Sequence, residues 1–401
     1  IRDTDRSRGL GDVYKRQHIM KYFFFLAVSI LLASCRNNNT GSNTQNNILQ
    51  ADLQPSTLSI HEIFDSIQVI PLETTDSCLL RAPVKVTTGN NRNYILDWKS
   101  FQVFVFDDEG HFLHTIGKKG QGPGEYREVY DMIVDESRKQ VKLLSPFGSL
   151  YVYDLEGQFI KQIRLPDKSN YQSMVAMGDK IITWTIPNGS DEPCITIVKA
   201  DTGEEVNNLW KGPRILNSVA PGNFYTYHKK SYFAPAFHDN EVYEITEDSL
   251  LLAYKWNFGE DNIDISSYKF TFTDDNQAEE GRLLTQYLKE NAIPYLLRSQ
   301  YQNEKFFYAG LSYGWFPNLT LKNLFYRKSD GKSFLFKDTQ EGILIRPEAF
   351  EDGYIMQFSF NEEFEAYQSV LAPEEYQKLM SRQEDDNPCP VSYTHLRAHE
   401  T

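Results

Sequence analysis

The sequence predicts an all-β protein, a six-bladed β-propeller in which an N-terminal strand closes the last blade and two helical segments are inserted. The first observation is a repeated hairpin at 103–117 and 150–163, in which two apolar strands flank an acidic turn that ends in Gly. The turn glycines Gly110, Gly157 and Gly203 follow one another at steps of 47 and 46 residues. A fixed period of this size is typical of repeat folds.

The second observation is a series of six two-strand units. In each unit a polar turn separates an apolar strand from an aromatic or β-branched strand, which indicates a hairpin. Each of the first five units is followed by a second hairpin, and these second turns fall at Gly110, Gly157, Gly203, near Ser249 and at Gly331. The six units span residues 84–96, 132–144, 174–184, 224–233, 295–308 and 347–356.

Two stretches depart from the strand pattern. Asp274–Asn291 carries leucine and tyrosine side chains at helical spacing, which predicts an amphipathic helix and explains the longer step before Gly331. Glu362–Arg382 is the second helical stretch, and Asp385–Pro388 then marks a turn.

The third observation concerns the two ends of the ring. A strand expected at Ser66–Leu72 has no partner nearby in the sequence, and the sixth unit lacks its second hairpin. In a closed ring, an N-terminal strand completes the last blade and removes an open sheet edge. An open β-sandwich with hairpin extensions is the alternative. A seven-bladed ring would suit the length alone, but six units can be counted.

Both ends of the chain differ from their neighbours. Residues 1–19 and 390–401 look like non-native translations of the two strands of one sequencing adaptor, and natural charged tails are the alternative. Such segments are excluded from fold prediction. The propeller is therefore predicted for residues 56–389, with its last blade short of about one strand.

Residues 20–34 are expected to be a lipoprotein signal peptide. A positive start precedes an apolar run that is too short to span a bilayer, which needs about 20 residues. The sequence Leu-Ala-Ser-Cys at 32–35 resembles the bacterial lipoprotein box, so Cys35 is the predicted lipidation site; an ordinary signal peptide with a chance Cys is the alternative. The polar residues 35–55 are then a flexible tether. The expected location is the outer membrane, with the periplasmic side favoured.

Charge and cysteine content exclude several classes of protein. The net charge is −14 and no basic stripe is present, so nucleic acid is not expected as a partner. Cys78 and Cys194 could form a disulfide in an oxidising compartment. No close-spaced cysteine pair indicates zinc or haem. We expect a monomer.

The link Ile116–Tyr126 is rich in glycine and looks like the link of NHL-type propellers. Together with Ile70–Thr74 and Phe106-Asp107, it makes residues 60–388 resemble the six-bladed β-propeller lipoproteins of Gram-negative gut-type bacteria. The resemblance implies a six-bladed propeller and a cell-envelope location, and no established activity. In that family the Asp-Asn-Pro turn leads into a last apolar strand, which this chain is expected to lack.

The predicted binding site is the mouth of the propeller channel, which is surrounded by the loops after second strands and by the links between blades. An aromatic and basic mouth would suit a sugar ring or an acidic ligand, so we expect non-catalytic recognition of a glycan, peptide or envelope protein. The alternative is that the tryptophans pack between blades and the basic residues are solvated. The candidates are Trp98, Trp184 and Trp315 near second strands, and Lys118, Lys119, Arg127 and Arg214 in the links.

No catalytic residue, metal site or cofactor is predicted. The loop Gly117–Gly124 lacks the Lys-Ser/Thr end and the following helix of a phosphate loop. His111 and His114 would lie on opposite faces of one strand. The alternative function is a metal-dependent hydrolase or lyase of the propeller lactonase type with a central divalent cation. Its available carboxylates are Asp97, Asp131 and Asp352.

Overall fold

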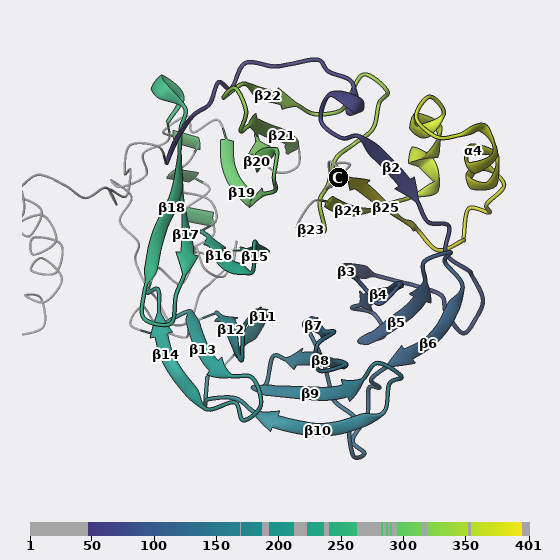
Figure 1. The fold of residues 1–401 in the computed structure, drawn as a ribbon, viewed down its shortest axis with the longest axis vertical. Coiled ribbons are helices and arrows are strands. Elements are labelled where there is room, and N and C mark those ends of the chain that lie inside the picture. Colours follow the sequence, from purple (N-terminus) through teal and green to yellow (C-terminus); the bar gives the residue numbers. More distant parts are fainter. Residues whose placement is uncertain are drawn as a thin grey trace, which may run out of the picture. The chain divides into compact units, whose positions relative to one another are not determined.

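The computed structural model shows a ring of six β-sheets around a central opening (Figure 1). The chain divides into Ile1–Asn46 and a second unit, Asn47–Thr401, which contains the ring. The predicted adaptor segment 1–19, the signal peptide and Cys35 lie outside the described residues. The structure describes residues 47–168, 170–186, 192–211, 223–235, 240–262, 282–283, 286–287, 289–290, 295–314, 319–351 and 354–394.

Each sheet is one blade, and this arrangement confirms the predicted six-bladed propeller and excludes the open sandwich. The first strand of each blade lies nearest the opening, and the four strands that recur in every blade are antiparallel to their neighbours (Figure 1). Blades 1 to 3 are β3 (Pro83–Gly89), β4 (Arg92–Asp97), β5 (Gln102–Asp107) and β6 (Phe112–Ile116); β7 (Asp131–Asp135), β8 (Gln140–Ser145), β9 (Ser149–Asp154) and β10 (Phe159–Arg164); and β11 (Tyr171–Met177), β12 (Lys180–Thr185), β13 (Ile195–Lys199) and β14 (Glu205–Leu209). Blades 4 to 6 are β15 (Asn223–Tyr227), β16 (Lys230–Ala234), β17 (Glu241–Ile245) and β18 (Leu250–Asn257); β19 (Tyr295–Gln302), β20 (Phe306–Tyr313), β21 (Thr320–Arg327) and β22 (Ser333–Phe336); and β23 (Ala349–Glu351), β24 (Tyr354–Ser359), β25 (Cys389–Thr394) and β2 (Ser66–Val69).

The N-terminal strand closes the ring as predicted. Strand β2 is the outermost strand of blade 6, where Ile67 lies opposite Tyr393 and Val69 opposite Val391. The strand ends before Pro71, because proline has no N–H to continue a ladder of hydrogen bonds. Closure removes the open edge that blade 6 would otherwise present.

The last blade is not short of a strand, so the prediction that the propeller stops at residue 389 is wrong. Strand β25 runs to Thr394 between β24 and β2 and supplies the missing strand. Its Val391 and Tyr393 are fully buried, and the Tyr393 ring lies 5.1 Å from that of Phe64. The sequence Pro-Val-Ser-Tyr-Thr alternates apolar and polar residues, which is the pattern a half-buried strand requires.

The predicted tether also ends earlier than expected. Residues 48–50 form β1 (Ile48–Gln50), which adds a parallel fifth strand to the outer edge of β18 in blade 4. Leu49 is buried there with Trp256. Further along, Pro55 bridges to Leu335 of blade 5, so the N-terminal segment follows the outer edges of blades 4, 5 and 6 in turn (Figure 1). These contacts order residues 47–55.

The second helical insertion is confirmed as two short helices between β24 and β25. They are η4 (Asn361–Tyr367) and α4 (Pro373–Met380), and proline at the first helical position starts the second helix. Most of the first insertion lies outside the described residues, and its described positions 282–283, 286–287 and 289–290 are helical. Two further short helices are η2 (Ile60–Glu62) and η3 (Gly259–Asp261). Within the described ranges, every helix is too short or too polar to cross a membrane.

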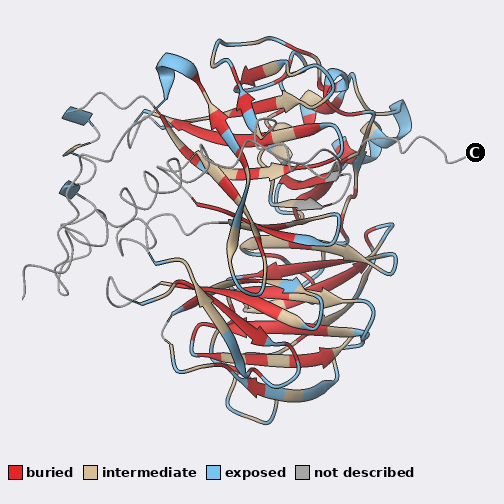
Figure 2. Ribbon diagram, turned by 60° about the vertical axis from the view of Figure 1, so that its left-hand side comes forward, coloured by how far each residue is buried: buried red, intermediate tan, exposed pale blue. Residues whose placement is uncertain are grey.

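The hydrophobic core lies between neighbouring blades, and the exposed residues are concentrated in the turns (Figure 2). Between blades 1 and 2, for example, Tyr94 packs in one buried cluster with Leu143. Cys78 and Cys194 belong to two separate clusters, so the possible disulfide between them is not formed. The ring is therefore held together by inter-blade packing.

Candidate functional site

The two faces of the ring carry different connections. Because alternate strands run in the same direction, the links between blades and the turns after second strands share one face, here termed the link face. The other turns lie on the opposite face. Four of the predicted binding residues lie on the link face: Trp98 follows β4, and Lys118, Lys119 and Arg127 lie in the link from β6 to β7.

The four residues lie on the part of the link face that covers blades 1 and 2, with Trp98 against Tyr130 and Arg127 against Phe147. We term this part of the link face the link surface. It consists of Trp98, Lys99, Lys118, Lys119, Arg127, Tyr130 and Phe147.

Two aromatic side chains of the link surface are unusually exposed. Trp98 is 48% exposed, its ring lies 5.8 Å from that of Tyr130, and its indole N–H donates to the Tyr130 carbonyl at 3.4 Å. Phe147, in the corresponding turn of blade 2, is 58% exposed. The Arg127 guanidinium lies over its ring at 5.1 Å, within the range of a cation–π interaction. Sequence analysis overlooked Phe147, which lies two residues past β8, whereas Trp98 lies one residue past β4.

The basic side chains of the link surface exceed its carboxylates. Lys118 pairs with Glu125 at 3.3 Å, and Arg127 lies 3.6 Å from Glu128. Hydrogen bonds from the Gly122 N–H and from Lys118 lower the pKa of Glu125. Lys119 lies over the Phe101 ring at 4.9 Å and, like Lys99, forms no ion pair with a described residue. The link surface is therefore locally basic on an acidic protein.

The glycine-rich link between β6 and β7 holds these side chains in place. Its buried Tyr126 donates a hydrogen bond to the Phe101 carbonyl at 2.5 Å, and the Gly120 N–H donates to the Tyr126 carbonyl at 2.9 Å. Gly117 has φ +80°, and a Cβ there would lie 2.2 Å from the Tyr126 hydroxyl. The glycines therefore serve a tight turn packed around one tyrosine.

Trp184 is not part of the mouth, so its prediction as a ligand-binding residue is wrong. It is 1% exposed, and its ring stacks on Phe233 of blade 4 at 5.4 Å. Its position inside β12 turns the side chain into the core, as the alternative interpretation expected. Arg214 and Trp315 lie outside the described residues.

Two of the carboxylates proposed for a metal-dependent enzyme instead bind groups of the propeller itself. Asp97 is fully buried and accepts hydrogen bonds from the N–H groups of Arg81, Ala82, Lys99 and Ser100 and from the Ser100 hydroxyl. Asp131 pairs with Lys85. Asp352 lies outside the described residues. Over the described part of the chain, no three His, Cys, Asp or Glu side chains gather to hold a metal ion.

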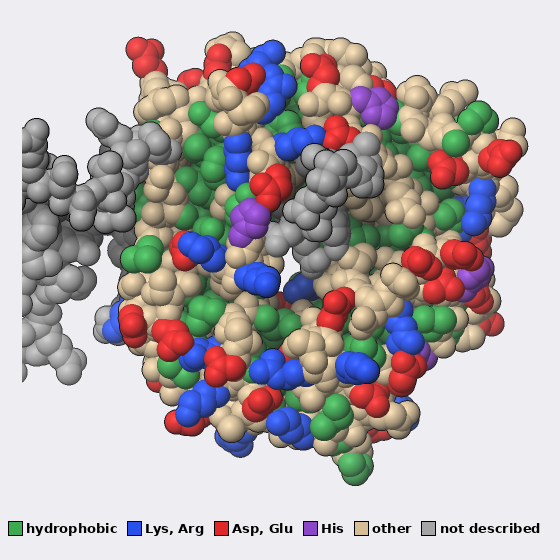
Figure 3. Space-filling view, in the orientation of Figure 1, with side chains coloured by type: hydrophobic (Ala, Val, Ile, Leu, Met, Phe, Trp, Pro, Cys, Tyr) green, Lys and Arg blue, Asp and Glu red, His purple; other side chains and the backbone are tan. Residues whose placement is uncertain are grey.

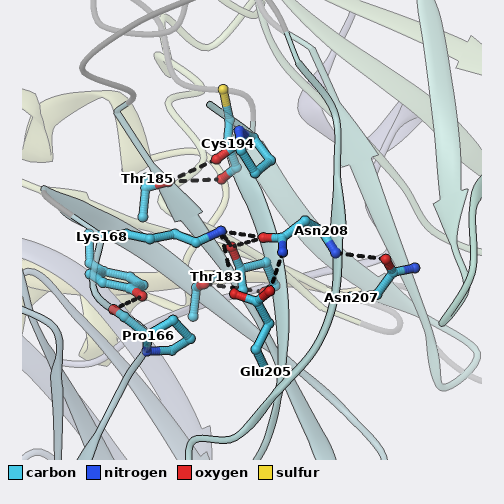
Figure 4. A network of polar contacts seen from close by, with 11 residues as sticks. Pro166, Lys168, Thr183, Thr185, Cys194, Glu205, Asn207 and Asn208 are labelled. Atoms are coloured by element: carbon cyan, nitrogen blue, oxygen red, sulfur yellow. Dashed lines mark hydrogen bonds and ion pairs between the residues drawn. The ribbon is translucent and has the colours of Figure 1, made fainter. Parts of the chain in front are cut away.

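Sequence analysis missed two partly buried lysines, because their partners come from separate strands. Lys168, in the link from blade 2 to blade 3, donates to the Thr196 hydroxyl at 2.7 Å and to the side-chain amide oxygen of Asn208, and pairs with Glu205 at 3.7 Å (Figure 4). Burial lowers the pKa of its amine, and Glu205 opposes the shift. No local motif signals such a network.

The second is Lys328, in the turn between β21 and β22 on the opposite face. Its amine lies over the rings of Tyr227 at 4.5 Å and Phe307 at 4.3 Å and donates to Gln302 at 3.1 Å. Burial lowers the pKa of Lys328 to about 8, against the opposing effect of Glu304. The lysine joins blades 4 and 5.

Three described cavities all lie around blade 6. The first, of 400 Å³, is lined by Glu341, Glu362, Glu363 and Glu365. The other two, of 280 and 350 Å³, lie where α4 faces the turn around His111. None of the three touches the link surface.

Acidic and basic side chains lie side by side over the face of the ring in Figure 3, with lysine and arginine side chains near the central opening.

Five four-stranded blades and the five-stranded blade 4, closed into a ring by an N-terminal strand, define a six-bladed β-propeller. Residues 44–394 match the family model described as a domain of unknown function, DUF4934, and the chain belongs to this family. No curated protein matches the chain in sequence.

Two solved structures share the fold. A Bacteroides fragilis protein assigned as exported is 16% identical, with a TM-score of 0.68 over 87% of this chain and 100% of that chain. A DUF4221-family member from Bacteroides vulgatus is 11% identical, with a TM-score of 0.51 over 82% of this chain and 96% of that chain. At these identities the comparisons show the propeller fold alone.

Proposed function

We propose that the protein is a lipid-anchored propeller of the cell envelope that recognises a glycan, peptide or partner protein without catalysis. The link surface carries this proposal. It combines two exposed aromatic rings with basic side chains that outnumber their carboxylate partners, whereas the chain as a whole has a charge of −14. Exposed aromatic and arginine side chains are typical of binding surfaces.

Two observations support the envelope location. Residues 20–35 have the form of a lipoprotein signal ending at Cys35, and a protein of the same fold is assigned as exported. The chain enters the propeller at the outer edge of blade 4, across the ring from blade 1 (Figure 1).

Cys35→Ser is expected to release the protein from membranes, because the thiol that would carry the lipid is removed. Membranes should be separated by centrifugation and the protein located by immunoblot, with Cys78→Ser as the matched control. The wild type and the control should stay with the membrane fraction. Membrane retention of Cys35→Ser would contradict lipid anchoring.

Replacing Trp98, Arg127 and Phe147 together by Ala is expected to abolish the ligand hits of the wild-type protein on glycan and peptide arrays. The matched control is Arg327→Ala with Phe360→Ala. It removes an arginine that lies 5.1 Å over the ring of Phe334, and an exposed phenylalanine, both outside the link surface. Thermal unfolding should confirm that both variants fold. Identical hits for the wild type and the triple variant would show that recognition does not use the link surface.

A further inference from the structure

We propose that the ligand of the link surface is an acidic polysaccharide, whose sugar rings stack on Trp98 and Phe147 and whose uronate carboxylates pair with Arg127 and Lys119. This inference rests on the proposed function and names the class of ligand. Three features of the described residues support it: the aromatic rings, the charge balance and the rigidity of the link.

The aromatic rings suit the flat, C–H-bearing face of a pyranose. Covering such a face removes apolar surface from water on both partners. Trp98 and Phe147 stand in equivalent turns of adjacent blades, so a ligand that contacts both must cross the link between them. A chain of repeating sugars can place one ring on each aromatic side chain.

The charge balance of the link surface favours a sugar chain that carries negative charge. Arg127 and Lys118 each have a carboxylate neighbour, but Lys99 and Lys119 have none among the described residues. A guanidinium can hold a carboxylate through two parallel hydrogen bonds. The ion pair of Arg127 with Glu128, at 3.6 Å, is long enough to be exchanged for a ligand carboxylate at little cost.

The rigid link reduces the entropy lost on binding. Glu125 accepts the Gly122 N–H at 2.9 Å, and the Tyr153 hydroxyl donates to the Gly124 carbonyl, so the backbone between Lys118 and Arg127 is held before a ligand arrives. Preorganisation of this kind raises affinity without new contacts.

A sugar chain fits this surface better than a peptide does. Peptides bind to sheets chiefly by adding a strand to an open edge or by laying a helix in an apolar groove. The link surface is built from turns and a link, so it offers neither a strand edge nor one of the three described cavities. Recognition by the link surface therefore depends on stacking against its aromatic rings and on ion pairs with the basic side chains beside them.

The experiment measures binding of the full chain by titration calorimetry at low and moderate salt. The probes are sodium polygalacturonate, alginate and hyaluronan, which carry uronate carboxylates on different sugars. Two comparators separate the contributions: fully methyl-esterified polygalacturonate keeps the rings without charge, and poly-glutamate keeps the charge without rings. The variants are Trp98→Ala, Arg127→Ala and the control Arg327→Ala with Phe360→Ala.

At least one uronate polymer should bind, and its affinity should fall as salt rises. Trp98→Ala should weaken binding by about tenfold, and Arg127→Ala should also reduce the salt dependence. The control variant should bind as the wild type does. The esterified polymer and poly-glutamate should bind at least tenfold more weakly.

Two outcomes would overturn the inference. Poly-glutamate binding that equals polygalacturonate binding and depends on Arg127 would overturn the ligand class but keep the link surface as a recognition site. If none of the three uronate polymers binds, the ligand class is again wrong, and the array comparison of the triple variant decides separately whether the surface recognises anything.

Discussion

Asn387→Ala is expected to lower the free energy of unfolding by about 3 kcal/mol or more. Asn387 is 1% exposed and joins the helical insertion of blade 6 to the link that leads into blade 1. Its amide oxygen accepts the Leu80 N–H at 2.7 Å, and its amide nitrogen donates to the carbonyls of Glu73 at 2.8 Å and Cys78 at 2.9 Å. Alanine would leave the buried Leu80 N–H and Cys78 carbonyl without this partner, and each such loss costs about 1–3 kcal/mol. It would also remove the bond to the Glu73 carbonyl, which still accepts from the Cys78 thiol at 3.3 Å.

Equilibrium unfolding in urea measures the effect as a shift of the midpoint at constant slope. Asp385→Ala is the matched control, because Asp385 is exposed in the same turn and its change should cost less than about 0.5 kcal/mol. Equal midpoints for Asn387→Ala and the wild type would show that the seam between blades 6 and 1 does not depend on this amide.

Asp131→Ala is expected to destabilise the propeller by about 3 to 5 kcal/mol. The Asp131 carboxylate, 7% exposed at the start of the innermost strand of blade 2, pairs with the Lys85 amine of blade 1 at 2.6 Å. It also accepts the Met174 N–H of blade 3 at 2.7 Å. One side chain thus joins three blades near the opening. Its removal would leave the Met174 N–H without its acceptor and the Lys85 amine without its counter-charge, with only the Met132 carbonyl at 3.0 Å still accepting from that amine.

A double-mutant cycle with Lys85→Ala tests this interpretation. The two single changes and the double change should reveal a coupling free energy of about 1 to 3 kcal/mol, since the two side chains are in direct contact. Asp131→Asn should retain part of the stability, because its amide oxygen can still accept the Met174 N–H. Additive effects of Asp131→Ala and Lys85→Ala would show that the pair contributes nothing beyond its separate packing.

The sequence predicted the architecture well because strands and turns leave local patterns. The six units, their turns and the closing strand follow from alternation and from glycine spacing alone. The two errors at the ends have a common cause. Strand β1 is three residues long within a polar stretch, and β25 lies in residues interpreted as foreign. Both segments are strands because they pair with a neighbouring strand, β1 with β18 and β25 with β24.

The positions of the link-surface residues in turns and links were predicted in part. Trp98 and Trp184 both stand near the end of a second strand, but Trp98 lies one residue past β4 and Trp184 lies inside β12, opposite Ile195. A difference of one or two positions relative to the strand end decides whether the side chain leaves the sheet or enters the core. Residues in links, such as Lys118 and Arg127, were easier to place, because links lie on the surface.

The sequence by itself determined the period of the fold, since each turn glycine marks where the backbone needs a positive φ. Only the tertiary structure shows why these glycine positions exclude residues that have a side chain. A Cβ at Gly110 would lie 2.3 Å from the Pro71 carbonyl oxygen, and one at Gly203 would lie 2.2 Å from that of Arg164, in the connection or strand that precedes each blade. The same holds for Asn387 and Asp131, whose partners are distant in sequence. Closure of the ring brings the partners of Asn387 within hydrogen-bonding distance, and packing of blades 1, 2 and 3 does so for Asp131. Local patterns record backbone conformation, whereas contacts between blades depend on how the whole chain closes.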